Sequence, residues 1–265
     1  MKILIICGDH FRHRFMLEPI LKMKCEINCI IMKRESQKYV RYDVAKPLNK
    51  KEGKLLDLHF KKRYKKEVNA FGSKTIYDFL DKQKIIEVDA INLNSTKVKK
   101  YIKKTNANLC FIMGPGLISE KVRKILPSKT FNIHLGLSPW YRGSATLFWP
   151  SYNLEPWKTG ITFHKLNSNA DSGEIIHHSV AKLKKGMDLF DLTISAMKEG
   201  RKDLKKILDH LSKGHKIKSY KQDFYGKSYS TKSFKPTHLK VIYELFNDKL
   251  IDYYLKNKKK LFYQN

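Results

Sequence analysis

Apolar residues in this chain occur in short continuous runs separated by longer segments with helical spacing. The runs at 2–7, 25–32 and 108–113 are almost wholly aliphatic or contain cysteine. Such runs are typical of strands that are buried on both faces of a parallel sheet. Between the first two runs, apolar residues from Phe15 to Leu21 recur at helical spacing, so the chain opens with an alternation of strand and helix.

The same alternation continues through most of the chain and predicts an α/β fold. We expect further strands over 88–93, 130–136, 159–166 and 174–181, and helices over 98–104 (with Ser95 as N-cap), 188–212 and 238–254. Strands that alternate with helices indicate a Rossmann-like, mostly parallel sheet with helices on both faces. From His215 onward the pieces are short, aromatic and basic. We therefore predict a main domain over 1–213 and a small C-terminal subdomain over 214–265.

The stretch from Arg34 to Phe71 interleaves many lysines with apolar residues. The apolar positions between Leu55 and Tyr64 fit the buried stripe of a helix whose opposite face is basic. A solvated helix face is the favoured interpretation, and an acceptor-side or nucleic-acid surface is the alternative.

The formal net charge of +29, from 54 Lys and Arg against 25 Asp and Glu, is a second strong feature. Cationic surfaces gain binding energy on phosphates by displacing counterions, so nucleic acid is a conceivable partner. The excess is spread along the whole chain, however, which favours a lysine-rich composition as its cause. An anionic small-molecule substrate also suits this charge.

The four cysteines, Cys7, Cys25, Cys29 and Cys110, lie in apolar runs without the paired spacing of a metal site. They are expected to be buried free thiols of a cytoplasmic protein. No run approaches the ~20 apolar residues needed to cross a bilayer, so no membrane partner is expected.

Chemistry is concentrated in one stretch. Asn132 and His134 are two apart in a predicted strand and therefore share a face, and the turn formers of a Pro-Trp-Tyr-Arg-Gly loop follow them. Asp171 lies in the turn between the next two predicted strands, and a hairpin could return it over the first strand. An amide can donate to an oxyanion, an imidazole can move a proton, and a carboxylate can orient the imidazole. Taken singly, these residues could equally be turn formers and a buried histidine.

The turn after the first strand carries His10, Arg12 and His13, which are candidates for binding the phosphates of a substrate. A solvated basic turn is the plainer alternative. No metal site is expected, because no further ligand set with zinc-like spacing accompanies these histidines. Gly8 stands alone after the strand, so a dinucleotide fingerprint is lacking and a nicotinamide cofactor is disfavoured.

The spacing of these residues resembles the 10-formyltetrahydrofolate-dependent formyltransferase family, whose signature is Asn-x-His-x-Ser-x-Leu-Pro-x-Tyr-Arg-Gly followed later by Asp-x-Gly. The chain matches it at Asn132, His134, Pro139, Tyr141, Arg142, Gly143, Asp171 and Gly173. It departs from the signature at Gly136, where the family usually has Ser, and at Ser138, where the family usually has Leu.

The resemblance implies that Asn132, His134 and Asp171 are catalytic and that 10-formyltetrahydrofolate is the formyl donor. It places the pterin ring of the folate against the backbone after the strand ending at Met113 and against the loop around 169–171. The residues implied to bind the folate are Met113, Gly114, Gly116, Leu117, Ile118, Asn169 and Gly173. An ordinary strand-to-helix turn is the alternative role for the two glycines after Met113. Tyr141 and Arg142 join the basic turn as candidates for substrate binding.

The acceptor is expected to be a primary amine, and by analogy the amino group of a nucleotide-linked sugar. Members of the family that act on initiator tRNA carry a larger C-terminal barrel than the ~50 residues after the long helix would form. Methionyl-tRNA, glycinamide ribonucleotide and an amino acid are the alternative acceptors. A non-catalytic basic nucleic-acid-binding module on the same fold is the alternative of a different class, and a homodimeric arrangement stays open.

Overall fold

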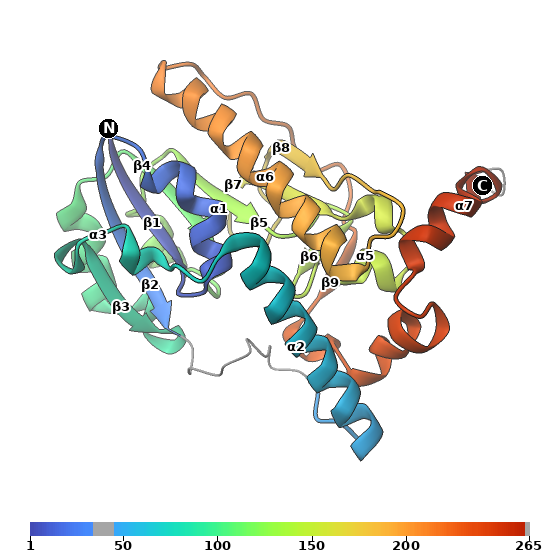
Figure 1. Cartoon of the computed structure of the whole chain (residues 1–265). Coiled ribbons are helices and arrows are strands. Elements are labelled where there is room, and N and C mark those ends of the chain that lie inside the picture. Colours follow the sequence, from blue (N-terminus) through green and yellow to red (C-terminus); the bar gives the residue numbers. More distant parts are fainter. Residues whose placement is uncertain (34–44, 263–265) are drawn as a thin grey trace.

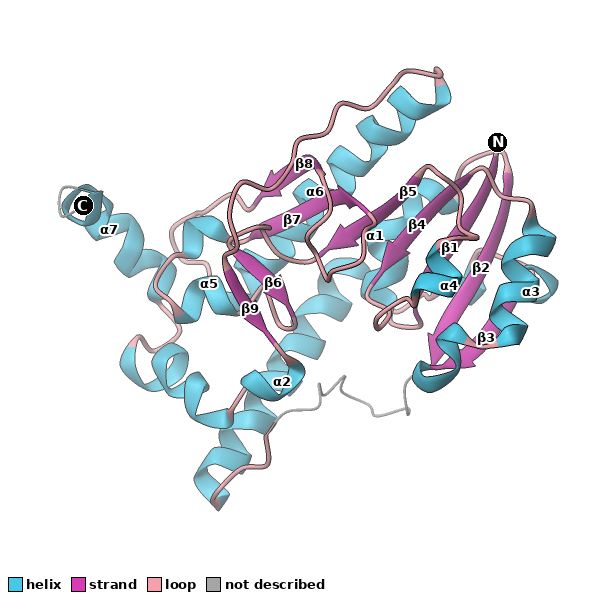
Figure 2. Ribbon diagram, turned by 180° about the vertical axis from the view of Figure 1, so that it is seen from behind, coloured by secondary structure: helices cyan, strands magenta, loops and turns pink. Residues whose placement is uncertain are grey.

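The computed structural model describes residues 1–33 and 45–262, so the first part of the basic stretch over 34–71 lies outside the described residues. A seven-stranded sheet with the order β3-β2-β1-β4-β5-β7-β8 forms its centre (Figure 2). The strands are β1 (Lys2–Gly8), β2 (Glu26–Lys33), β3 (Ile85–Asp89), β4 (Leu109–Met113), β5 (Thr130–His134), β7 (Gly160–Lys165) and β8 (Ile175–Val180).

The strands from β3 to β5 run parallel to one another, and only β7 and β8 are antiparallel to their neighbours. The turn between β7 and β8 leaves the sheet beside the start of β5, because Lys165 pairs with Phe131. It then folds back along β5, so that Asp171 reaches His134 at the end of that strand. The predicted Rossmann-like α/β fold, with a mostly parallel sheet, is confirmed.

Helices cover both faces of this sheet (Figure 1). On one face, α1 (Phe11–Leu21) and α6 (Leu189–Ser212) share a core with the side chains of Ile3 and Ile5. On the other face, α3 (Thr96–Thr105) and α4 (Glu120–Arg123) pack on Leu4 and Ile6. Alternate residues of β1 thus enter different cores, as expected for a strand that is buried on both faces.

The helix α2 (Lys50–Phe71) contacts α1 and α6 and extends from the sheet toward the C-terminal segment (Figure 1). A second core joins buried side chains of α2 and α6 to Phe234, Ile242 and Ile251 of the C-terminal segment. The remaining elements are α5 (Trp149–Tyr152), the π-helix η7 (Val241–Leu245), α7 (Leu250–Phe262), and the small two-stranded sheet of β6 (Tyr141–Gly143) and β9 (Lys227–Tyr229). Short 3-10 helices lie at Ile76–Asp78, Lys82–Lys84, Ala90–Asn94, Pro156–Lys158, Thr231–Ser233 and Pro236–His238.

Two predicted elements were wrong in their bounds. The strand expected over 88–93 is β3, which ends at Asp89, and the chain continues as a 3-10 helix over Ala90–Asn94. Leu93, the last apolar residue of the predicted strand, is buried in this helix against Val98 and Ile102 of α3. The helix expected over 238–254 is interrupted at Asn247 and Asp248, which both have positive φ. The Asp248 carboxylate accepts hydrogen bonds from Lys62 and from the backbone of Leu189.

All four cysteines are free thiols, and three of them are buried in the strands of the sheet. Burial raises the pKa of the Cys110 thiol well above its usual range. Across residues 1–33 and 45–262, no helix has the length and apolar character that a transmembrane span requires.

Candidate active site

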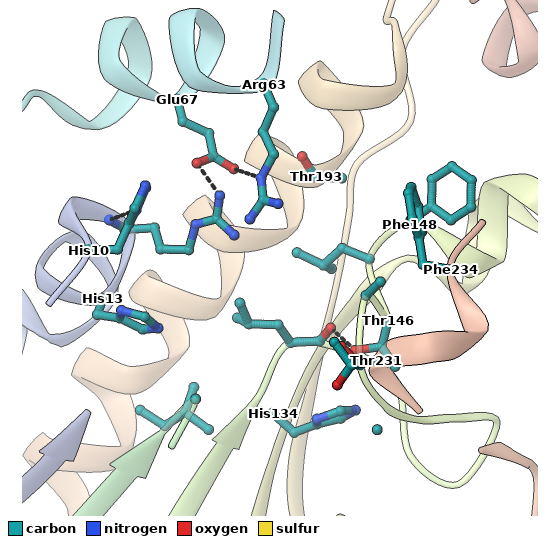
Figure 3. Close-up of a pocket in the computed structure, with 18 of the residues that line it drawn as sticks. His10, His13, Arg63, Glu67, His134, Thr146, Phe148, Thr193, Thr231 and Phe234 are labelled. Carbon is teal, nitrogen blue, oxygen red and sulfur yellow. Dashed lines mark hydrogen bonds and ion pairs between the residues drawn. The ribbon is translucent and has the colours of Figure 1, made fainter. Parts of the chain in front are cut away.

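A cavity of about 350 Å³ lies at the edge where β1, β4 and β5 end (Figure 3). Three of its walls come from distant parts of the chain: the start of α1, the middle of α2, and the loops that follow β5. In parallel sheets, ligands bind outside the carboxyl ends of the strands. The cavity contains all three residues that the sequence singled out for catalysis, Asn132, His134 and Asp171.

The turn between β7 and β8 brings Asp171 onto the end of β5. Its Oδ1 lies 3.2 Å from the ring Nδ1 of His134 and accepts a hydrogen bond from the Asn132 amide, also at 3.2 Å. Its Oδ2 accepts the backbone N–H of Gly143 at 2.9 Å. The carboxylate therefore ties together the strand, the hairpin turn and the loop after β5.

His134 is buried, and both of its ring nitrogens face acceptors. Nδ1 faces the Asp171 carboxylate, and Nε2 lies 3.0 Å from the carbonyl oxygen of Tyr141. Burial lowers the pKa of His134, but the Asp171 carboxylate and the Tyr141 carbonyl outweigh it and raise that pKa above its ordinary value. Burial likewise raises the pKa of Asp171, and the His134 charge outweighs it to hold that pKa well below its usual range. Both shifts favour an imidazolium beside a carboxylate.

The sequence reasoning missed a second histidine at this site. His164 on β7 is almost fully buried, and its Nε2 lies 2.9 Å from the Asn132 Nδ2. Its Nδ1 faces the Lys165 carbonyl at 2.8 Å, so Nδ1 carries the proton and Nε2 accepts from the amide. Both hydrogens of the Asn132 amide are thus directed at acceptors, His164 and Asp171. The register of β5 with β7, which pairs Asn132 with His164, could have pointed to this contact.

The departure from the family signature at Gly136 has a steric counterpart. A Cβ at position 136 would lie 2.5 Å from the His134 Nε2 and 2.6 Å from the Thr146 Cβ. The space next to Gly136 is therefore filled by the side chain of Thr146, whose hydroxyl donates to the Leu135 carbonyl. Thr146 also lines the cavity, so a hydroxyl reaches this wall from a different position of the loop.

The wall opposite His134 is built from α1 and α2 (Figure 3). Arg12 and Arg63 both donate to the Glu67 carboxylate, the second at 3.2 Å, and all three residues are buried. Burial raises the pKa of Glu67, and Arg12 offsets that effect only in part. His10 and His13 lie beside this group at the start of α1. Two lining guanidiniums and one lining carboxylate make this wall attractive to an anion.

The stripe of α2 that carries these residues also carries His59. Its ring is buried among aromatic side chains that include Phe148, Phe190 and Phe234, and its Nδ1 lies 2.9 Å from the Tyr243 hydroxyl. Burial lowers the pKa of His59 to about 3, with a smaller contribution from Lys62. This side of the cavity is therefore aromatic and uncharged. The favoured interpretation of α2 as a solvated helix was incomplete, because its buried stripe forms part of the cavity.

The residues expected to bind the folate are in different environments. Gly114 and Gly116 line the cavity, and a side-chain atom at Gly116 would meet open space. Leu117 beside them is 74% exposed, whereas Met113 and Ile118 are buried. Asn169 is exposed in the hairpin turn, and Gly173 approaches the Lys165 carbonyl so closely that a side chain would not fit there.

Tyr141 and Arg142 were expected to bind the substrate, but neither belongs to the described residues that line the cavity. The Tyr141 hydroxyl donates to the Glu155 carboxylate, and its ring stacks on Tyr229. The Arg142 guanidinium lies 4.9 Å from the centre of the Tyr225 ring. In this arrangement both side chains hold the loop and the C-terminal segment together.

Solved structures share this fold at low sequence identity. A 4-N formyltransferase from Francisella tularensis has a TM-score of 0.55 at 17% identity, and the match covers 86% of this chain and 76% of that one. An N-formyltransferase from Helicobacter canadensis, solved with folinic acid and dTDP-3-aminofucose, has a TM-score of 0.54 at 20% identity and covers 89% and 73%.

Sequence comparison gives a more specific result. A methionyl-tRNA formyltransferase of Flavobacterium psychrophilum is 26% identical over 148 residues, which is 56% of this chain. The match spans 46%, about half, of that relative's length. The family model described as formyl transferase matches residues 54–208, more than half of the chain, and this range includes Asn132, His134 and Asp171. The chain therefore belongs to the formyl transferase family.

Proposed function

We propose that the protein transfers a formyl group from 10-formyltetrahydrofolate to a primary amine. The observation that carries this proposal is the contact of Asp171 with both Asn132 and His134 at the mouth of a cavity large enough for a small substrate. Bound 10-formyltetrahydrofolate would supply a reactive formyl group and a nitrogen that leaves as an amine. The remaining tasks fall to the side chains of this chain.

Asn132 is the proposed donor to the carbonyl oxygen of the formyl group. Its two N–H groups are directed at His164 and Asp171, so one of these hydrogen bonds has to be exchanged for the bond to that oxygen. The exchange costs little, because one acceptor replaces another. A donor held in place before the reaction is the kind that contributes most to catalysis.

His134 is proposed to place a positive charge beside that oxygen. The ring already faces two acceptors, so it can take a proton from the attacking amine only after it has lost one of its own. Its charge is therefore the better-supported role, and Asp171 both maintains that charge and orients the ring. Asp171 is also the proposed route by which the proton of the amine reaches the departing folate nitrogen.

For the folate, we propose that Gly114, Gly116 and Leu117 present backbone and apolar surface to the pterin ring, with Met113 and Ile118 buried beneath them and Asn169 and Gly173 across from them. The open space at Gly116 and the exposed side chain of Leu117 support this assignment. A flat ring fits against backbone that carries no Cβ. The loop after β4 therefore suits a flat folate ring, which would be held there without taking part in the reaction.

For the acceptor, we propose a nucleotide-linked amino sugar. The wall of Arg12, Arg63, His10 and His13 suits the diphosphate of such a molecule, and the aromatic side of the cavity suits a sugar or base. The solved relative with bound dTDP-3-aminofucose supports this choice. The match to a methionyl-tRNA formyltransferase makes charged tRNA the second candidate.

An acceptor screen tests both levels of the proposal. The purified protein is mixed with 10-formyltetrahydrofolate and, in separate reactions, dTDP- and UDP-linked amino sugars, glycinamide ribonucleotide and methionyl-tRNA, and tetrahydrofolate release is followed. We expect release with an amino-sugar nucleotide, unaffected by competitor tRNA. If tetrahydrofolate is released only with methionyl-tRNA, the acceptor is charged tRNA and not an amino-sugar nucleotide. If it is released with no amine, the proposed activity is overturned.

A further inference from the structure

The C-terminal segment 219–229, called the strap below, crosses both loops that carry catalytic groups. At its start, the backbone of Tyr220 exchanges two hydrogen bonds with Ile175, at 2.8 and 3.0 Å, next to the turn of Asp171. At its end, β9 pairs with β6 in the loop after β5. The strap thus connects the hairpin turn to the loop after β5, and it lies outside the range that the family model matches.

Between these two backbone pairings, the side chain of Gln222 is hydrogen-bonded to the hairpin turn. Its Nε2 donates to the carbonyl oxygens of Asp171 and Gly173, both at 2.9 Å. Asp171 has a φ of 51°, in the left-handed region that residues other than glycine rarely adopt. Such a conformation persists where surrounding contacts hold it, and the two bonds from Gln222 are contacts of this kind.

Further along, the strap packs on the loop after β5. The Phe224 ring lies edge-on to Trp140 with centroids 5.8 Å apart, and the Tyr225 ring lies over Arg142. The backbone N–H of Lys227 donates to the Trp140 carbonyl at 3.0 Å. The loop that supplies the Gly143 N–H and the Tyr141 carbonyl to the catalytic pair is therefore held by the same segment that holds Asp171.

We propose that Gln222 is a positioning residue: it fixes the turn that carries Asp171, so that the strap sets the spacing between that carboxylate and the His134 ring. The inference rests on the proposed formyl transfer for its purpose, but the spacing itself can be measured without turnover. Displacing a reacting group by ~1 Å can reduce a rate by about 10²-fold, so such a device would matter for catalysis.

The test variant is Gln222→Met, which keeps the length of the side chain and removes both donors. The measurement is the titration of His134 by NMR on histidine-labelled protein, with its signal assigned by comparison with His134→Gln. The charged or titratable groups that face the ring are Asp171, Arg142 and His164. Only Asp171 raises the pKa of His134 by its charge, so a turn that moves away should lower that pKa toward its ordinary value.

Turnover is the second readout. We expect kcat to fall on the order of tenfold in Gln222→Met, with the KM for 10-formyltetrahydrofolate nearly unchanged, because a misplaced carboxylate affects the reaction more than binding. The matched control is Asp223→Ala at the next position, which is exposed and should leave both the titration and kcat as they are.

An unchanged His134 titration in a folded Gln222→Met protein would overturn the proposal, whatever its activity. Should Gln222→Met fail to fold, Gln222→Ala also removes both donors and adds no charge, and an unchanged His134 titration in that variant would equally overturn the proposal. If the wild-type protein transfers no formyl group but Gln222→Met still shifts the titration, the positioning role stands while the proposed function fails.

Discussion

At the strand ends, His134 and Asp171 are held by backbone groups, whereas on the opposite wall Arg12, Arg63 and Glu67 hold one another through side chains on two helices. The first group is electrically balanced and comes from the stretch that matches the family signature. The second carries more positive than negative groups and comes from α1 and α2. The difference suggests a division of labour, in which the strand ends perform the reaction and the helices select the acceptor.

The strongest test of this division is Asn132→Ala. Loss of a preorganised oxyanion donor should reduce kcat on the order of 10²–10³-fold, with little change in the KM of either substrate. Steady-state kinetics measured by tetrahydrofolate release would show this split. Asn132→Asp keeps the shape of the side chain but removes its N–H donors, so it should be no more active than Asn132→Ala. Near-full turnover of Asn132→Ala would remove the proposed role.

On the opposite wall, Arg63→Gln should have the reverse effect. Removing a charge-assisted hydrogen bond to an anionic acceptor is expected to raise the KM for that acceptor by roughly tenfold or more while kcat changes little. Lys65→Gln provides the matched control, because it removes a positive charge two residues away on the exposed side of α2. If both variants raised the KM for the acceptor equally, the net positive charge of the protein, and not the position of Arg63 in the cavity, would explain the effect.

The smallest expected effect is a shift in pH dependence. The pKa of His134 is raised and that of Asp171 is lowered, so the charged pair persists over a broad range and is lost as the pH rises through the pKa of His134. We expect kcat to decline on the alkaline side only, by up to about tenfold per pH unit. In Asp171→Asn the burial of His134 is no longer offset, so this decline should begin at a lower pH. An unchanged profile would contradict the pairing.

The sequence predicted the strand ends well for a local reason. Residues two apart in a strand share a face, which places Asn132 beside His134, and the β7–β8 turn folds back over the neighbouring strand β5, which adds Asp171. The same rules predicted the buried strands and the N-cap at Ser95, which the structure contains.

The opposite wall followed from no local rule. Arg12 and Glu67 are 55 residues apart, and their meeting depends on how α1 packs against α2. The lysine-rich helix α2 was therefore interpreted as a solvated surface, although the buried residues on its other face line the cavity. The broken last helix has a similar origin, because the partners of Asp248, Lys62 and Leu189, lie far away in the sequence. Whether the C-terminal segment counts as a separate subdomain stays a prediction.

The exchange of bulk between positions 136 and 146 constrains how this loop could have diverged from its relatives. A serine at position 136 collides with both the His134 ring and the Thr146 side chain, so a smaller residue at position 146 relieves only part of the clash. Position 136 is therefore coupled to position 146 and to the placement of the His134 ring, and a serine there requires both neighbours to change.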